Sequence, residues 1–333
     1  MREALWYEKL ADEQVTCGLC PHRCRLKPGK TGICRVRHNK DGVLYSHNYG
    51  QCSPPTLDPI EKKPLYHFYP GSMILSVGTI GCNFKCRFCQ NWELAHGDPS
   101  LYQIEPARLA AMARRYQNEG SVGIAYTYSE PIVWYEFIKE TAELAHDYGL
   151  KNVLVTNGFI EQEPFQELLP YIDALNIDVK GFNREFYREM IKGDYLPVLR
   201  TAEQAYEAGK HVEITTLLIP GLNDRKEKIE ELTDWLAGAL GPEVPLHFSR
   251  YVPRYQMELP PPTPKETLLK AKAIAEEKLH YVYLGNAPEL DGSNTFCPEC
   301  EALVIERRGY GIKVKGLAGN RCLECGAELN IVC

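Results

Sequence analysis

Three closely spaced cysteines are the residues of this sequence best suited to carry chemistry. Cys82, Cys86 and Cys89 follow the pattern C-x3-C-x2-C within residues 81–90. Three thiolates can bind three irons of a [4Fe–4S] cube and leave the fourth iron without a protein ligand. An open metal position is where a substrate or cofactor binds. Taken alone, the triad also fits a zinc or structural Fe–S site, but the rest of the chain favours the open cluster.

A second group of cysteines lies near the N-terminus, at Cys17, Cys20, Cys24 and Cys34. Four thiolates fit a tetrahedral zinc site, and four thiolates also serve an Fe–S cluster. We favour zinc here and keep a second cluster as the alternative. Disulfides are not expected, because a secreted disulfide scaffold would be small and would lack the long cysteine-free middle of this chain.

A third group forms two C-x2-C pairs, Cys297 with Cys300 and Cys322 with Cys325. The sequence between the pairs predicts a hairpin over residues 302–315, with its turn at Gly309–Gly311. The pattern is typical of a zinc ribbon or a rubredoxin-like module, and zinc is favoured over iron. A module of about 40 residues buries little core, so bound metal would supply its stability. Cys52 and Cys333 remain outside these groups, and Cys52 is expected to be a buried thiol.

The elements that must position the central triad alternate between strand and helix. Apolar or β-branched runs predict strands at 73–78, 122–126, 152–156, 174–178, 212–219, 245–249 and 281–284. Helical segments are predicted between them, at 105–118, 131–147, 163–169, 183–191, 199–208, 225–239 and 264–279. Regular alternation of this kind implies an α/β fold with a parallel sheet. No G-x-G-x-x-G motif opens a helix, so a dinucleotide-binding fold is not supported.

Polar residues follow the predicted strands at the point where each one ends. They include the triad itself, Thr127–Pro131, Thr156–Gly158, Asp178–Lys180 and Asn223–Asp224. In α/β barrels the carboxyl ends of the strands form the rim at which active sites are built. A buried ion pair between Asp178 and Lys180 is the structural alternative for these two residues. Asp58, Glu61, Lys62 and Lys63 could also reach an active site, although salt bridges at the surface or in a linker are the commoner role for such residues.

Composition and charge set broader limits. The chain has 333 residues, with 44% hydrophobic and 25% charged residues, as in an ordinary globular protein. No signal peptide and no membrane span are expected, which predicts a cytoplasmic protein. A net charge of −6 argues against a general nucleic-acid binder, although residues 23–40 hold seven cations and no acid. This basic segment could be a binding patch, or it could offset the negative charge of a tetra-thiolate site.

These motifs together resemble the radical SAM (S-adenosylmethionine) superfamily, and within it the enzymes related to pyruvate formate-lyase activase. The sequence is most similar to the AmmeMemoRadiSam-system radical SAM enzymes. The resemblance rests on the N-terminal cysteines, the triad segment, the terminal cysteine pairs and four shorter segments, 58–65, 126–131, 156–158 and 178–180.

The resemblance implies a partial (β/α)6 TIM-like barrel with a [4Fe–4S] cluster on Cys82, Cys86 and Cys89. SAM would chelate the fourth iron, and reductive cleavage of SAM would give a carbon-centred radical. Residues implied to contact SAM are Phe88, Ser129, Glu130, Thr156, Asn157, Asp178, Lys180 and Asn223. Glu130 stands where the activases carry a Gly-Gly-Glu segment, but its flanking glycines are absent.

Three regions are expected: a cysteine-rich extension over 1–70, the barrel over 71–290 and the zinc-ribbon-like module over 291–333. Expected partners are an electron donor of the flavodoxin or ferredoxin type and, by the resemblance, Memo-like proteins. The substrate is expected to be a small molecule or a dedicated partner protein, with activation of a glycyl-radical enzyme as the alternative. Because residues 58–68 lead directly into the strand before the triad, we expect the terminal regions to line or cap the barrel mouth. The alternative is that they plug the far end of the barrel. A ferredoxin-type electron carrier and a zinc-stabilised nucleic-acid-binding protein are the alternatives from other classes.

Overall fold

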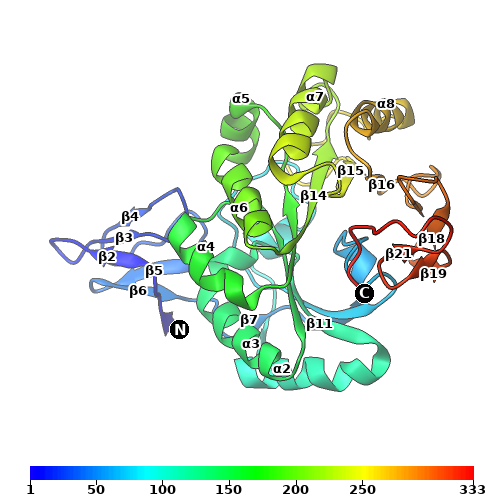
Figure 1. The fold of residues 1–333 in the computed structure, drawn as a ribbon. Helices are drawn as coiled ribbons and strands as arrows, with labels where there is room; N and C mark the ends of the chain where they lie inside the picture. Colours follow the sequence, from blue (N-terminus) through cyan, green and yellow to red (C-terminus); the bar gives the residue numbers. More distant parts are fainter.

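The computed structural model describes residues 1–333 and places one open barrel at the centre of the chain (Figure 1). Six parallel strands form the barrel core, in the order in which they occur along the chain. They are β9 (Met73–Val77), β11 (Ser121–Tyr126), β12 (Lys151–Thr156), β13 (Ala174–Asp178), β14 (His211–Leu218) and β15 (Leu246–Arg250). This confirms the partial (β/α)6 barrel and every predicted strand within it.

Two more strands extend the sheet at its edges. β16 (Val282–Gly285) adds a parallel strand beside β15, and β8 (Thr56–Pro59) adds an antiparallel strand beside β9. The edge strands β8 and β16 do not pair with each other, so the barrel stays open along one side.

Helices cover the outside of the sheet because each presents one apolar face to it. Helix α3 (Tyr135–Asp147), for example, buries Phe137, Ile138, Thr141, Ala142 and Ala145, which recur at helical spacing. The other connecting helices are α2 (Pro106–Arg115), α4 (Gln162–Leu168), α5 (Arg184–Phe186), α6 (Leu196–Glu207), α7 (Lys226–Trp235) and α8 (Lys265–Glu276). Each of them overlaps a predicted helical segment, although α4 begins one residue and α6 three residues before the predicted start. The short helix α1 (Trp92–His96) was not predicted.

The N-terminal region folds into two small antiparallel sheets on one side of the barrel (Figure 1). One contains β1 (Arg2–Glu3), β6 (Val43–Ser46) and β5 (Arg37–Lys40), and the other β2 (Tyr7–Lys9), β3 (Val15–Cys17) and β4 (Arg25–Leu26). A two-stranded pair joins β7 (Gln51–Cys52) to β10 (Tyr102–Gln103). Strands of two to four residues carry too little alternation to be found from sequence. Cys52 is fully buried and lies outside the metal-ligand groups, as expected.

Residues 59–72, which we call the plug, cross the end of the barrel at which the strands begin. Because β8 runs antiparallel to β9, with Thr56 opposite Ser76 and Pro59 opposite Met73, the chain leaves β8 beside the start of β9. The expectation that this segment lines or caps the mouth is therefore corrected. It closes the opposite end, since the antiparallel pairing carries the chain there before β9 brings it back.

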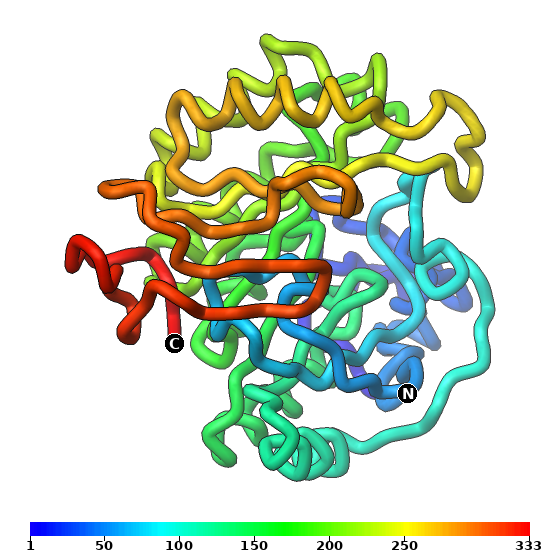
Figure 2. The backbone as a smooth tube through the Cα atoms, turned by 90° about the vertical axis from the view of Figure 1, so that its right-hand side faces the viewer, coloured from blue at the N-terminus to red at the C-terminus, as the bar shows by residue number.

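The C-terminal module lies on the side of the barrel away from the N-terminal sheets and runs beside the plug (Figures 1 and 2). The predicted hairpin is present as β18 (Leu303–Arg308) and β19 (Gly311–Val314), with β17 (Thr295–Phe296) beside it. A second small pair joins β20 (Leu317–Ala318) to β21 (Arg321–Cys322). The module therefore does not cover the mouth.

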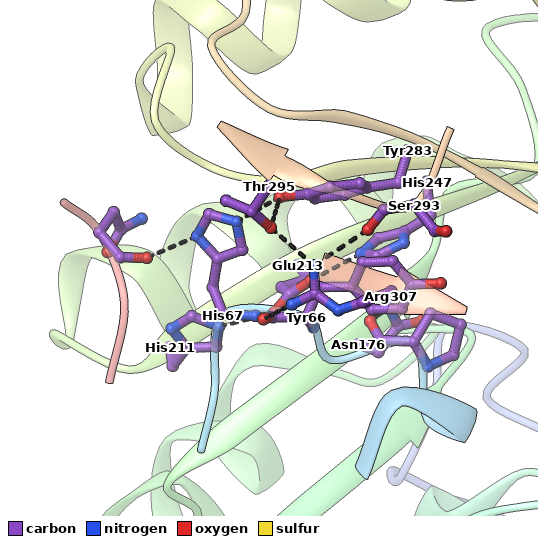
Figure 3. Close-up of polar contacts among 12 residues, drawn as sticks. Tyr66, His67, Asn176, His211, Glu213, His247, Tyr283, Ser293, Thr295 and Arg307 are labelled. Atoms are coloured by element: carbon purple, nitrogen blue, oxygen red, sulfur yellow. Dashed lines mark hydrogen bonds and ion pairs between the residues drawn. The ribbon is translucent and has the colours of Figure 1, made fainter. Parts of the chain in front are cut away.

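A buried polar network ties the plug and the module to the barrel (Figure 3). Glu213, on β14, is fully buried and accepts hydrogen bonds from the backbone N–H groups of Tyr66 and His67 at 3.0 and 2.7 Å. Its carboxylate also bonds His211 Nε2 at 3.0 Å and His247 Nε2 at 2.6 Å. Arg307 of the module donates to the Tyr66 carbonyl at 2.6 Å, so the module is tied to the same plug residue whose N–H group Glu213 holds.

Candidate cluster and cofactor site

A cavity of about 440 Å³ opens at the carboxyl ends of the barrel strands. The three central cysteines line it together with polar residues from the following strand ends, which the sequence had placed on one rim. The predicted residues on its wall are Cys82, Cys86, Cys89, Phe88, Ser129, Glu130, Thr156, Asn157, Asp178 and Lys180.

The triad lies on an irregular loop that follows β9. Gly81 has φ +96°, and a Cβ there would lie 2.8 Å from the carbonyl oxygen of Cys34, so only glycine fits without a shift. The Cys82 sulfur is close to two donors, Phe84 N at 3.4 Å and Asn157 Nδ2 at 3.8 Å. Burial raises the pKa of Cys82 well above its ordinary value, so metal binding must displace protons from the site.

Sulfur spacing separates the triad from the C-terminal cysteines. Cys297, Cys300, Cys322 and Cys325 form the single group of three or more His, Cys, Asp or Glu side chains whose ligand atoms all lie within 4.8 Å of one another. A cluster spreads its thiolates farther apart than one ion does, because irons and sulfides lie between them. The wider spacing of the triad therefore fits an Fe–S cluster, and the C-terminal group fits a single metal ion.

Glu130 occupies the end of β11 and is almost completely buried. Its Oε1 accepts from Ile132 N at 3.0 Å and Thr156 Oγ1 at 2.6 Å, and its Oε2 accepts from Asn157 N at 2.8 Å. Burial raises the pKa of Glu130 to about 7, against the opposing effect of these bonds. A carboxylate has about four acceptor positions, so one position on Oε2 remains for a ligand in the cavity.

Asp178 and Lys180 lie at the end of β13 and form an ion pair, with Nζ 3.1 Å from Oδ2. Burial alone would lower the pKa of the Lys180 ammonium. The nearby Asp178 carboxylate and the Cys86 sulfur have the larger, opposite effect, so the pKa of Lys180 is raised. The ion pair expected as the structural alternative is present, and both residues also line the cavity. The pair therefore offers one charge of each sign beside the triad.

The remaining predicted contacts fall into two groups. Phe88 stacks on Phe186 with ring centroids 6.0 Å apart, and the Ser129 hydroxyl donates to the carbonyl of Thr79. Asn223 does not line the cavity. Its amide nitrogen donates to the carbonyls of Lys180 and Leu217 at 2.7 and 2.8 Å, so it fixes the loop that carries Lys180. The structure thus places Asn223 as a positioning residue rather than a cofactor contact.

The floor of the cavity holds residues that were not among those implied to contact SAM, although Lys62 and Lys63 had been named as able to reach an active site. Lys62, Lys63 and Pro64 of the plug line it from below, with Asn176 and Thr215 on the neighbouring strands. Lys63 is 1% exposed, and its ammonium lies 2.7 Å from the carboxylate of Asp58 and 4.9 Å from the ring centre of Tyr128. The acids and lysines of residues 58–63 had suggested both roles, and the structure shows a buried ion pair of which Lys63 also lines the cavity.

The N-terminal cysteines surround a separate, small cavity. Cys17, Cys20, Cys24 and Cys34 all line it, together with Arg37 and apolar side chains that include Val133. The two cavities are neighbours, since His22 Nε2 lies 2.7 Å from the carbonyl oxygen of Asn83, beside Cys82. No helix in the chain combines the length and the apolar character needed to cross a membrane.

Comparison with known proteins agrees with this geometry. The Radical SAM superfamily model matches residues 76–236, from β9 through α7. The chain is 44% identical over the full length of both proteins to the uncharacterized protein MJ0808 of Methanocaldococcus jannaschii. It is 25% identical to the pyruvate formate-lyase 1-activating enzyme of Escherichia coli, over 61% of this chain and 88% of that one.

Among solved structures, SuiB of Streptococcus suis bound to S-adenosylmethionine superposes with a TM-score of 0.51 and 16% identity, over 68% of this chain and 55% of that one. At this identity the similarity concerns the fold alone. The family model, the activase relative and the cysteine-lined rim of the barrel agree with one another. The chain is a radical SAM enzyme that belongs to the radical SAM superfamily and is related to the pyruvate formate-lyase activating enzymes.

Proposed function

We propose that Cys82, Cys86 and Cys89 hold a [4Fe–4S] cluster whose open iron binds SAM, and that the enzyme acts on a small polar substrate enclosed below it. The observation that carries this proposal is the single cavity that the triad shares with Glu130, Asp178, Lys180 and the plug. When bound, the cluster and SAM supply a carbon-centred radical. The chain itself binds, orients and shields the reactants.

SAM has an amino group, a carboxylate and a cationic sulfonium, so its site needs acceptors and a cation. The unused acceptor position on Glu130 Oε2 suits the amino group, and Lys180 suits the carboxylate. Thr156 and Asn157 keep the Glu130 carboxylate in place through bonds of 2.6 and 2.8 Å. Phe88 and Ser129 complete the wall on either side.

The substrate class follows from the closed floor of the cavity. Lys63 and Pro64 block the end of the barrel through which a protein loop could reach the site from below. The floor is polar, because Asn176 and Thr215 line it and the buried Thr215 hydroxyl has no hydrogen-bond partner. A buried hydroxyl without a partner is costly, and a polar substrate group would satisfy it. A dedicated protein partner, Memo-like by the family resemblance, would have to approach from the mouth.

Two further parts of the proposal concern metals and electrons. The C-terminal cysteines bind one zinc ion, since Cys297 and Cys325 have sulfurs 3.6 Å apart and Cys300 and Cys322 have sulfurs 3.7 Å apart. A tetrahedral zinc with bonds of about 2.3 Å places its sulfurs about 3.8 Å apart. Reduction of the cluster requires a one-electron donor, which we assign to the flavodoxin or ferredoxin class.

The test is anaerobic reconstitution of the full chain, followed by reduction with dithionite and addition of SAM. We expect an EPR signal from the reduced cluster that changes when SAM binds, and no signal that responds to SAM in the Cys86→Ser variant. A reconstituted cluster that never responds to SAM would overturn the assignment.

The substrate is tested with cell extract separated into a small-molecule fraction and a protein fraction. We expect SAM fragments and labelled products by mass spectrometry only with the small-molecule fraction. A glycyl-radical EPR signal on a large protein in the other fraction would instead establish activation of a glycyl-radical enzyme. The 25% identity to an activating enzyme makes this the second candidate.

A further inference from the structure

We propose that Cys17, Cys20, Cys24 and Cys34 bind a second [4Fe–4S] cluster, and that it passes electrons to the cluster held by the central triad. This inference rests on the proposed function. It assigns a cluster to the site for which the sequence alone had favoured a zinc ion. Four observations carry it: the convergence of the four thiols, their spacing, an unpartnered buried donor and the contact between the two sites.

The four thiols converge because two tight turns present them to one cavity. The first turn follows β3 and is closed by Cys17 N bonded to the Cys24 carbonyl at 3.0 Å. The second brings Cys34 back, with Arg35 N bonded to the Gly32 carbonyl at 2.9 Å. Cys17 and Cys34 are buried, Cys20 and Cys24 are half-buried, and all four line the same cavity. Four thiols around one cavity form a metal site rather than four independent residues.

The spacing of these sulfurs distinguishes a cluster from a zinc ion. The C-terminal sulfurs lie 3.6–3.7 Å apart in pairs, close to the separation of about 3.8 Å that zinc requires. No three of the N-terminal sulfurs lie within 4.8 Å of one another, and the same is true of the central triad. Both of these groups are therefore more widely spaced than the C-terminal cysteines, and the wider spacing suits a cluster better than a single ion.

Arg37 supplies an independent sign of an anionic ligand. It is 1% exposed and lines the N-terminal cavity, and its two Nη groups bond Glu136 at 2.7 and 2.9 Å. Its third donor, Nε, is buried without a partner. A buried donor needs an acceptor, and the sulfur atoms of a cluster are acceptors that would fill this cavity.

The two cysteine sites touch each other through the backbone. Gly81, next to Cys82, packs so closely on Cys34 that a Cβ would lie 2.8 Å from the Cys34 carbonyl oxygen. A cluster at the N-terminal site would thus be separated from the first one by a single layer of residues, a suitable arrangement for electron transfer.

The outer surface of the N-terminal site suits an acidic electron carrier. Its exposed cations are Arg25, Lys27, Lys30, Arg35 and Lys40, with no acidic residue within 23–40, whereas Arg23 is paired with Glu8 and Glu161. Complementary charge raises the rate at which such partners associate. A reduced carrier of the flavodoxin or ferredoxin class loses one electron, which reduces the second cluster from 2+ to 1+. That cluster returns to 2+ when it passes the electron to the first, and no covalent bond changes.

Metal content tests the cluster itself. After anaerobic reconstitution we expect about eight irons and about one zinc per wild-type chain. The Cys82→Ser/Cys86→Ser/Cys89→Ser variant should keep about four irons and an EPR signal that SAM does not alter. The Cys20→Ser/Cys24→Ser variant should keep about four irons and a SAM-responsive signal, while Cys333→Ser serves as control. A triad variant with no iron and about two zincs would overturn the second cluster but leave the radical SAM assignment intact.

The electron route is tested with two reductants. A reduced flavodoxin should reduce the first cluster much more slowly in Cys20→Ser/Cys24→Ser than in the wild type, whereas dithionite should act on both equally. The surface variant Arg25→Glu/Lys27→Glu/Lys30→Glu should slow only the flavodoxin reaction. A matched control reverses three exposed lysines on and just beyond helices α7 and α8, Lys226, Lys270 and Lys278. Equal flavodoxin rates in wild type and cysteine variant would overturn the relay.

Discussion

Arg37 and Glu136 form a fully buried, two-point ion pair that joins the N-terminal sheets to helix α3. The Nη1–Oε1 and Nη2–Oε2 distances are 2.7 and 2.9 Å, and the two side chains are 1% and 2% exposed. Glu136 Oε1 also accepts from Leu5 N at 3.0 Å. The contact fixes the strand that carries Arg37 beside the N-terminal cysteines against the barrel.

Removing one member of this pair should be strongly destabilising. We expect Glu136→Gln to lower the free energy of unfolding by about 3–5 kcal/mol, because a buried guanidinium loses its counter-charge. The double variant Arg37→Met/Glu136→Leu should recover most of this loss, since it removes both members of the buried pair. Denaturant unfolding monitored by circular dichroism measures both. A single variant as stable as the wild type would contradict this role.

Glu213, which holds the plug against the barrel, should make the folding stability of the protein depend on pH. Burial alone would raise the pKa of the Glu213 carboxyl. Hydrogen bonds from His211 and His247 outweigh this effect and hold that pKa well below its usual range. Because the folded-state pKa is depressed, the stabilisation is present above the unfolded pKa of about 4.3 and is lost as pH falls below it. We expect Glu213→Gln to lower the melting temperature near neutral pH, and the difference from wild type to shrink below about pH 4. A constant difference across this range would contradict the prediction.

SAM binding should strengthen as Glu130 ionises. Burial raises the pKa of Glu130 to about 7, so the carboxyl is mostly protonated at pH 6 and mostly ionised at pH 7.5. Only the ionised carboxylate can accept a hydrogen bond from the amino group of SAM at the remaining position on Oε2. We expect the SAM dissociation constant of the reconstituted enzyme to fall about eightfold over this interval, in proportion to the ionised fraction. The Glu130→Gln variant should bind weakly at both values, and equilibrium dialysis against labelled SAM provides the measurement.

Lys180 should contribute to SAM affinity through its charge. We expect Lys180→Met to weaken SAM binding about 10- to 100-fold, which corresponds to the loss of a hydrogen bond to a charged group. Iron content should stay at the wild-type value, because Lys180 is not a cluster ligand. Lys226→Met, on the exposed surface of α7, is the matched control. Unchanged SAM affinity in Lys180→Met would show that the lysine serves only its ion pair with Asp178.

Loss of zinc should affect the C-terminal module alone. Cys300 and Cys325 are exposed, so Cys300→Ser/Cys325→Ser removes two ligands with little loss of packing. We expect this variant to lose its zinc, to become sensitive to proteolysis within 291–333 and to keep its full iron content. Cys333→Ser, also exposed, should behave as wild type. Retained zinc in the double variant would contradict the ribbon assignment.

The sequence by itself determined the barrel and its rim. The strands and most helices repeat apolar patterns over five residues or more, and local periodicity is enough to identify such elements. The triad and the C-terminal pairs have short, fixed spacings, so their metal-binding role can be read from neighbouring residues. Glu130, Asp178 and Lys180 follow strand ends, and parallel strands bring their carboxyl ends to one edge in any such fold.

Only the tertiary structure decided how the remaining parts meet. The plug lies at the far end because β8 pairs antiparallel with β9, a register that depends on contacts between segments rather than on the sequence of either one. Asn223 follows a strand end like its neighbours, yet its amide bonds the backbone of Lys180 and Leu217. Sulfur spacing within each cysteine group is likewise a distance in space, so cysteine intervals along the chain could not separate a zinc ion from a cluster.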